Sequence, residues 1–199
     1  MAALLDAYDD AAFDEQLPIN LQLKANFHFT PVEVARHVAR LLAPEDSMSV
    51  LDVGSGAGKF CIAAGRAIPG AQFIGVEWRP HLVQIATRLA EEAKLSNVRF
   101  VHEDALALDW SGYDGFYFYN PFAEQLSERP FLLDETIAFD PPNYITYVMG
   151  VRERLARARP GTRVATYHGF GAPPPPGYEL DRMDAIGSDR VELWVKTAP

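Results

Sequence analysis

The sequence lacks the features that mark several classes of protein. It has one cysteine, Cys61, so no internal disulfide can form, and we expect this residue to pack as a small apolar side chain. No basic stretch precedes an apolar run near the first residue, and no apolar run approaches the length of a membrane span. These absences predict a cytoplasmic protein without a membrane partner.

Clustered metal ligands and an excess of positive charge are also missing. The spacing of the five histidines fits no metal-ligand set, which predicts that there is no metal site. These residues are His28, His37, His81, His102 and His168.

The chain carries 27 acidic and 18 basic side chains, for a formal net charge of −9. Because nucleic-acid-binding domains present basic surfaces, this charge argues against a nucleic-acid partner and favours a cationic substrate.

What the sequence does contain is a glycine-rich turn between a strand and a helix. The apolar run Met48–Val53 predicts a buried parallel strand, and Lys59–Ala67 predicts the helix after it. The turn between them carries Gly54, Gly56 and Gly58. Glycine permits positive φ angles and lets a ligand touch bare backbone, so the turn predicts an adenosine-containing cofactor.

Acidic residues end this strand and follow the next two expected strands. Asp52 stands two places before the first glycine, and Glu77 ends the apolar run Phe73–Val76. Asp104 follows the run Val98–Val101. A carboxylate at the end of the second strand is placed to hold a ribose diol through paired hydrogen bonds. The three strand ends together predict a nucleoside site.

Spacing separates the cofactors that use such a turn. A phosphate-binding P-loop needs glycine where Val53 stands, and Ser or Thr where Phe60 follows Lys59. A dinucleotide fingerprint needs its third glycine where Lys59 stands. Nucleoside triphosphates and NAD are therefore the weaker interpretations.

The pattern Asp-x-Gly-x-Gly-x-Gly, with acids after the second and third strands, resembles the motifs of class I (seven-strand, Rossmann-like) methyltransferases that depend on S-adenosylmethionine (SAM). The resemblance implies SAM as cofactor, with Asp52 orienting the turn near its amino group, Glu77 on the ribose hydroxyls and Asp104 on the adenine amino group. The cofactor-binding residues it implies are Thr30, Asp52, Gly54, Ser55, Gly56, Gly58, Glu77, Trp78, Asp104, Ala105 and Asn120.

An amphipathic helix is expected ahead of the first strand. Thr30-Pro31-Val32-Glu33 has the pattern of a capping box, which predicts a helix over Pro31–Ala43. In the family such a helix often covers the methionine end of the cofactor, so His28, Phe29 and Thr30 are candidates for a lid. A plain helix cap is the alternative. Residues 1–27 are expected either to close the substrate pocket as a helix or to be partly mobile.

The fourth expected strand, Tyr113–Tyr119, ends in Asn120-Pro121-Phe122. This tripeptide resembles the (Asn/Asp)-Pro-Pro-(aromatic) motif of methyltransferases that modify planar amino groups, and the Asn-rich aromatic corner of non-SET lysine methyltransferases. The resemblance makes Asn120, Pro121 and Phe122 the catalytic candidates, with the asparagine carbonyl aiming an amine at the methyl group. An aromatic core strand that ends in a simple turn is the alternative.

A second copy of this motif, Asp140-Pro141-Pro142-Asn143-Tyr144, lies too late in the chain for that position. We expect it to begin a helix over Tyr144–Ala158, which makes 121–143 a long connection of the kind that often carries substrate contacts. A fifth strand, Arg163–Tyr167, and an antiparallel hairpin of Tyr178–Met183 with Val191–Val195 should follow.

Together these features predict one α/β domain over residues 1–199, with a helical cap at 1–43 and a Rossmann-like core at 44–199. Its sheet should be doubly wound, mostly parallel and seven-stranded, with a C-terminal antiparallel hairpin. The predicted function is methyl transfer from SAM to an amine-type acceptor, with protein lysine as the leading acceptor. A small-molecule methyltransferase, an RNA methyltransferase and a non-catalytic SAM-binding module remain as alternatives. No single side chain stands out as a base.

Overall fold

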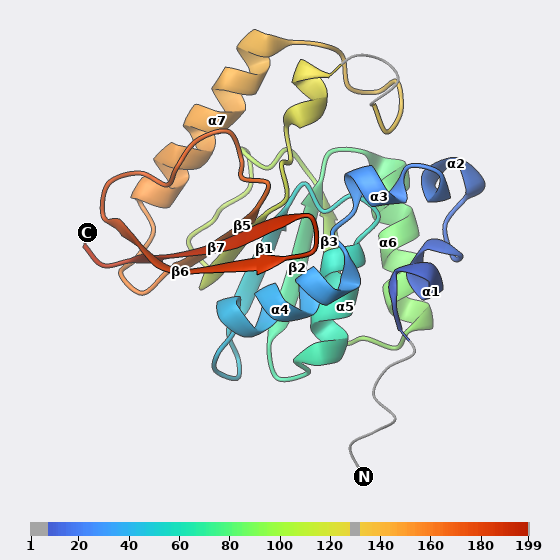
Figure 1. The fold of residues 1–199 in the computed structure, drawn as a ribbon, viewed down its shortest axis with the longest axis horizontal. Coiled ribbons are helices and arrows are strands. Elements are labelled where there is room, and N and C mark those ends of the chain that lie inside the picture. The colour runs from blue at the N-terminus through green and yellow to red at the C-terminus, as the bar shows by residue number, and fades with distance from the viewer. Residues whose placement is uncertain (1–7, 128–131, 199) are drawn as a thin grey trace.

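Seven strands form one mixed sheet in the order β3-β2-β1-β4-β5-β7-β6 (Figure 1). The structure, a computed structural model, describes residues 8–127 and 132–198. The strands are β1 Ser49–Val53, β2 Gln72–Glu77, β3 Val98–His102, β4 Gly115–Phe118, β5 Arg163–Tyr167, β6 Tyr178–Ile186 and β7 Asp189–Lys196. The first five are parallel, and β7 runs antiparallel to β5 and to β6. The predicted fold class, including the C-terminal hairpin, is confirmed.

The strands that follow β1 in the chain lie on both sides of it in the sheet, which makes the place between β1 and β4 a topological switch point. Strands β2 and β3 extend the sheet to one side of β1, while β4 and β5 extend it to the other. In an open parallel sheet, ligands bind beyond the carboxyl ends of the strands at such a switch point. The glycine turn after β1 and the Asn120 corner after β4 therefore meet at the same place.

Helices cover both faces of the sheet (Figure 1). The longer ones are α4 Val32–Leu42, α5 Lys59–Ala67, α6 Pro80–Glu92 and α7 Pro141–Ala156. Side chains of α4, α5 and α6 share one buried cluster with Phe73 and Tyr117, whereas α7 packs on the other face with Phe116 and Phe118. The alternation of neighbouring residues between the two clusters follows from the two-residue period of a strand.

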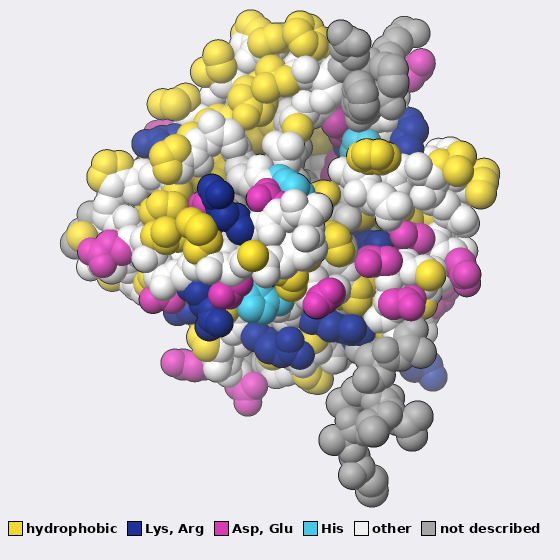
Figure 2. All heavy atoms as spheres, in the orientation of Figure 1, with side chains coloured by type: hydrophobic (Ala, Val, Ile, Leu, Met, Phe, Trp, Pro, Cys, Tyr) yellow, Lys and Arg dark blue, Asp and Glu magenta, His cyan; other side chains and the backbone are white. Residues whose placement is uncertain are grey.

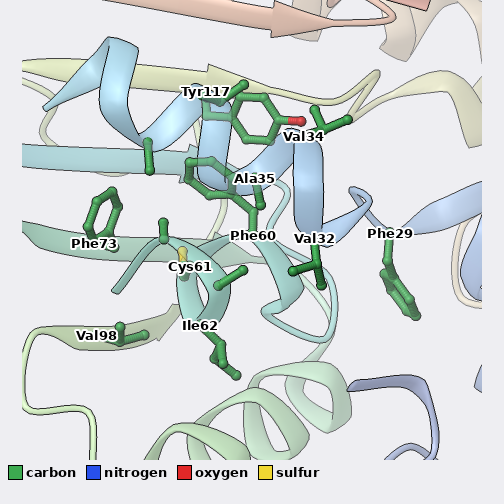
Figure 3. Close-up of a cluster of buried hydrophobic side chains, with 14 of the residues drawn as sticks. Phe29, Val32, Val34, Ala35, Phe60, Cys61, Ile62, Phe73, Val98 and Tyr117 are labelled. Atoms are coloured by element: carbon green, nitrogen blue, oxygen red, sulfur yellow. The ribbon is translucent and has the colours of Figure 1, made fainter. Parts of the chain in front are cut away.

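Aromatic contacts fix α5 against the sheet. The rings of Phe60 and Tyr117 stack with centroids 4.1 Å apart, and Figure 3 shows them facing each other beside α4. Cys61 is fully buried in the same cluster, as expected of a packing residue. These contacts hold the start of α5 against the sheet, and so fix the position of the glycine turn that precedes it.

Three short helices replace the single N-terminal helix that was one of the expectations: α1 Asp10–Asp14, α2 Ile19–Gln22 and α3 Ala25–His28. They join the core through buried Phe13 and Leu21. The ammonium of Lys59, which is itself buried, lies 2.8 Å from the carboxylates of both Asp10 and Asp14. Residues 1–7 lie outside the described part of the chain.

The predicted capping box at Thr30 is wrong. Helix α4 begins at Val32 without a side-chain cap from Thr30, whose hydroxyl lies 3.0 Å from that of Tyr117. The backbone amide of Val32 instead donates a hydrogen bond of 2.9 Å to the Asp10 carboxylate. A residue 22 positions away supplies the acceptor that the local pattern assigned to Thr30.

Helix α7 begins at Pro141, three residues earlier than expected, because the Asp140 carboxylate accepts a hydrogen bond from the backbone amide of Asn143. The connection before it contains one short 3-10 helix among its described residues, η1 Ala123–Leu126. Among the helices of residues 8–127 and 132–198, none has the length and apolar composition needed to cross a bilayer.

Candidate functional site

Two cavities open at the carboxyl ends of the parallel strands and share the residues Gly54, Glu77, Arg79, Pro121 and Glu124. The Asp104 cavity, of about 300 Å³, is lined further by Trp78, Asp104, Ala105, Phe122, Gln125, Asn143 and Tyr147. The Asn120 cavity, of about 910 Å³, is lined further by Leu23, Phe27, Phe29, Gly56, Tyr119, Asn120, His168 and Ser188. Most of the predicted site residues thus line these two adjoining cavities.

The glycine turn brings the backbone to the junction of the two cavities. Gly54 has a φ of +77°, and a Cβ placed on it would lie 2.8 Å from the Cβ of Pro121. Glycine at position 54 therefore lets Pro121 pack directly against the turn, and a side chain there would displace Pro121. Gly58 lines neither cavity; a Cβ there would lie 2.5 Å from the Phe100 ring, so this glycine allows α5 to pack closely on its neighbours.

Glu77 is buried and held by two backbone amides. Its Oε2 accepts a hydrogen bond of 3.0 Å from Gly56, and its Oε1 accepts one of 2.9 Å from Arg79. A carboxylate has about four acceptor positions, so both oxygens can still accept from a ligand. Because Glu77 lines both cavities, its carboxylate is fixed in a position suited to a diol that bridges them.

The far end of the Asp104 cavity combines a carboxylate with aromatic side chains. Asp104 accepts a hydrogen bond of 2.8 Å from the Leu106 amide, and burial together with Asp104 raises the pKa of Tyr147 to about 12. The Tyr147 ring stacks on Phe122 with centroids 4.8 Å apart. A planar apolar group with polar edges, such as a purine, suits these surroundings.

The second copy of the motif also reaches this cavity. Its prediction as a helix start is confirmed by α7, yet Asn143 lines the Asp104 cavity rather than standing apart from the site. It is absent from the lining of the Asn120 cavity. The two asparagines that the sequence offered therefore face different ends of the same space.

Sequence reasoning missed Arg79. Its guanidinium is almost fully buried and binds Glu124, Asp134 and Thr136, so the connection after β4 is tied to the end of β2. Burial alone would lower the pKa of Arg79, but Glu124 and Glu77 raise it above its ordinary value. No sequence pattern around Arg79 distinguishes it from an arginine exposed on the surface, so its burial could not be predicted.

Asn120 stands at the mouth of the larger cavity in a left-handed backbone conformation, with a φ of +44°. Its backbone amide donates a hydrogen bond of 2.8 Å to the carbonyl oxygen of Gly169, after β5. The Asn120 side chain is exposed and has no hydrogen bond to any of the described residues. Tyr119 beside it adds an aromatic wall.

Three predicted cofactor residues lie behind the glycine turn. Thr30, Asp52 and Ser55 line a small space of about 10 Å³ and neither of the two cavities. Burial raises the pKa of Asp52 to about 8, against a lowering by the hydrogen bond from Cys61 and a further rise from Glu77. The roles assigned to these three residues and to Gly58 toward a ligand stay predictions.

Comparisons with known proteins agree with this geometry. Residues 44–121 match a family described as "Methyltransferase domain". Over 127 residues the chain is 31% identical to demethylmenaquinone methyltransferase of Thermus thermophilus, covering 64% of this chain and 48% of that protein. A stretch of 54 residues is 41% identical to tRNA (guanine-N(7)-)-methyltransferase of Rubrobacter xylanophilus, covering 27% and 24%. The chain thus spans about half the length, or less, of these curated relatives.

A solved structure extends the likeness to nearly the whole fold. The RNA methyltransferase from Salinibacter ruber, in complex with S-adenosyl-L-homocysteine, is 25% identical and superposes with a TM-score of 0.56. The likeness covers 85% of this chain and 94% of that one. Residues 44–121 thus match a methyltransferase domain, and the sheet order and the position of the two cavities give the chain the fold of the class I SAM-dependent methyltransferases.

Proposed function

We propose that this protein transfers a methyl group from SAM to an amine-type nitrogen. The observation that carries the proposal is the exposed side-chain amide of Asn120, which has no hydrogen bond to any described residue and lines the same cavity as Gly54 and Pro121. An amide oxygen there can accept a hydrogen bond from an amine N–H and so direct the nitrogen lone pair. The sulfonium of SAM supplies an already activated methyl group, so alignment and removal of water are the main demands on the protein.

The residues around the two cavities fit SAM. The adenosine would occupy the Asp104 cavity, with Glu77 on the ribose, and the methionine part would run past Gly54 and Gly56 into the Asn120 cavity. Gln125, which lines the Asp104 cavity, has a buried side-chain oxygen without a hydrogen-bond partner among the described residues. A buried polar atom without a partner is costly, and a ligand donor nearby can remove that cost.

Protein lysine is the first acceptor candidate. The Asn120 cavity is larger than its neighbour and has apolar walls from Phe27 and Tyr119, which suit the long apolar stem of a lysine. The net charge of −9 favours approach of a cationic segment. The same charge argues against RNA, the acceptor class in the names of two of the similar proteins.

A small molecule is the second candidate. The side chains of Leu23 and Phe27 line the Asn120 cavity and are 77% and 76% exposed. Figure 2 shows apolar side chains on this part of the surface, over α2 and α3, and again over α7. An apolar rim fits a small apolar acceptor, and the Thermus thermophilus relative is named for a small molecule.

The test is to incubate the protein with methyl-labelled SAM and a cell lysate separated into protein, RNA and metabolite fractions. The proposal expects label in the protein fraction, on lysine, and a loss of most label with Asn120→Ala. The matched control is Asn20→Ala, since Asn20 is an exposed asparagine on α2 outside both cavities. Label in the RNA or metabolite fraction would show that the acceptor is an RNA or a small molecule and not a protein lysine. SAM binding without label anywhere would indicate a non-catalytic module.

A further inference from the structure

Three histidines among the described residues lie close to an aspartate. The distances are 2.8 Å from His37 to Asp184, 3.2 Å from His81 to Asp134 and 2.7 Å from His168 to Asp189. Of these three histidines, His168 is the one that lines the Asn120 cavity. This pair therefore has access to an acceptor, and the other two serve as internal comparisons.

The sheet fixes the position of the His168 ring. His168 follows β5, and Asp189 is the first residue of the antiparallel neighbour β7. The rings of Tyr167 and Tyr119 lie against the imidazole with centroid distances of 4.5 and 5.5 Å. Asp189 approaches Nδ1, while Nε2 has no partner among the described residues. The arrangement leaves one nitrogen of the imidazole available to the cavity.

Backbone conformation joins His168 to Asn120. Both residues have left-handed φ angles, +60° for His168 and +44° for Asn120. The hydrogen bond from the Asn120 amide to Gly169 ties the two turns together. Left-handed backbone at residues other than glycine costs free energy and is concentrated at functional sites. Two adjacent instances at the mouth of one cavity indicate that the positions of both side chains matter.

We propose that Nε2 of His168 accepts the proton that an alkylammonium acceptor loses before methyl transfer, with Asp189 as the positioning residue. This inference rests on the proposed amine acceptor. The N–H bond of the acceptor breaks, its electron pair becomes the nitrogen lone pair, and the proton forms a bond to Nε2. The lone pair then bonds to the methyl carbon while the carbon–sulfur bond breaks and its electrons stay on sulfur. Imidazolium returns the proton to water through its exposed edge.

The proton transfer from a lysine ammonium to an imidazole is uphill in water, because ordinary pKa values are near 10.4 for lysine and 6.5 for histidine. Contact with apolar side chains favours the neutral amine. Tyr119 lines the cavity next to the ring, and the carboxylate of Asp189 lies 2.7 Å from Nδ1 and holds the ring in place.

Other titratable groups near the ring determine how a pH profile is interpreted. Burial raises the pKa of Tyr119 to about 12, so it stays protonated through neutral and mildly alkaline pH. Tyr167 packs on the ring from β5, His28 lines the same cavity from α3, and Glu192 lies on β7 near Asp189. A pH effect assigned to His168 must therefore disappear when that residue alone is replaced.

The experiment uses poly-L-lysine as the acceptor probe and tritiated SAM, with initial rates measured from pH 7 to pH 10. The variants are His168→Gln, Asp189→Asn and, as matched control, His37→Gln. We expect His168→Gln to lower kcat about 100-fold at pH 7.5, the lower end of general-base effects, with affinity for S-adenosylhomocysteine retained. The difference in kcat between His168→Gln and the parent should become smaller as pH rises, because lysine then loses its proton to solvent. Asp189→Asn should lose about 10-fold with the same recovery, and His37→Gln should match the parent.

Each alternative outcome has a distinct meaning. Full activity of His168→Gln on poly-L-lysine would overturn the assignment of His168 as proton acceptor and leave the proposed amine transfer intact. A loss of activity that is equal at every pH would show a structural role for His168 and would also overturn this assignment. If the parent binds S-adenosylhomocysteine but methylates no poly-L-lysine, this inference fails, whereas label on another nitrogen in the lysate fractions would keep the proposed amine transfer. Should His168→Gln not fold, parental rates for Asp189→Asn would overturn the pairing.

Discussion

The two ends of the site are held in place by different means. At the Asp104 end, the carboxylates of Glu77 and Asp104 accept hydrogen bonds from backbone amides in the turns after β1, β2 and β3, which fix their oxygens before any ligand binds. At the Asn120 end, Asn120 and His168 have left-handed backbone; the Asn120 amide donates to Gly169, after β5, and the His168 ring pairs with Asp189 on β7. The first end is organised by backbone amides in turns, and the second by contacts that depend on the pairing of β5 with β7. Damage to the first should therefore weaken binding, and damage to the second should slow turnover.

The largest effect should come from Gly54, one of the residues that line both cavities. Gly54→Val places a branched side chain against Pro121 in a left-handed conformation, so we expect affinity for S-adenosylhomocysteine to fall more than 100-fold by calorimetry. Gly161→Val is the control, because Gly161 has a similar φ of +88° and no atom within 4 Å of the added Cβ. Equal losses in both variants would mean that backbone strain, not the displacement of Pro121, is responsible.

Asn120→Ala should separate turnover from binding. We expect kcat to fall by roughly one to three orders of magnitude, the scale for loss of one preorganised hydrogen-bonding group, with affinity for SAM nearly unchanged. Asn143→Ala should show the opposite pattern, since Asn143 lines the Asp104 cavity. Isotope transfer and calorimetry on both variants test the contrast. Normal turnover by Asn120→Ala would place the acceptor elsewhere.

Glu77→Ala should affect binding alone. We expect SAM binding to weaken by about 1.5 to 3 kcal/mol, the range for a hydrogen bond to a charged group. Glu77→Gln should lose less, because its amide oxygen can still accept from one of the two backbone amides now bound. Calorimetry checks both variants. Equal affinity in parent and Glu77→Ala would remove this residue from the cofactor site.

The last effect concerns stability and pH. Burial raises the pKa of Asp52 to about 8, so the folded protein keeps this proton where an unfolded chain has lost it, and stability falls as pH rises from 4 to 8. Asp52→Asn should remove this pH dependence. Between pH 5 and 8 the parent should lose up to about 4 kcal/mol more than the variant, since each of these three pH units corresponds to about 1.4 kcal/mol. Urea unfolding at several pH values measures the difference; parallel profiles would contradict it.

The same contrast explains what could be predicted from sequence. Helix α5 and the hairpin were predicted from periodicity and turn residues, and Glu77 and Asp104 lie at strand ends, where local pattern suffices. The Asp10 cap of α4 and the His168–Asp189 pair join residues far apart in the chain. Such contacts depend on which strands become neighbours, and β5 pairs with β7 rather than β6. No local pattern contains that information.

The burial of Lys59 has a consequence for where this protein can be shortened. Its ammonium depends on two carboxylates from α1, although α1 precedes the matched methyltransferase region by about thirty residues. A fragment that starts near residue 30 would keep every glycine of the turn but lose both carboxylates and the Phe13 ring that covers the ammonium. The region matched by the family comparison is thus shorter than the part of the chain that packs into one core. A 30–199 fragment should give less soluble protein on expression than the full chain, and equal yields would contradict this.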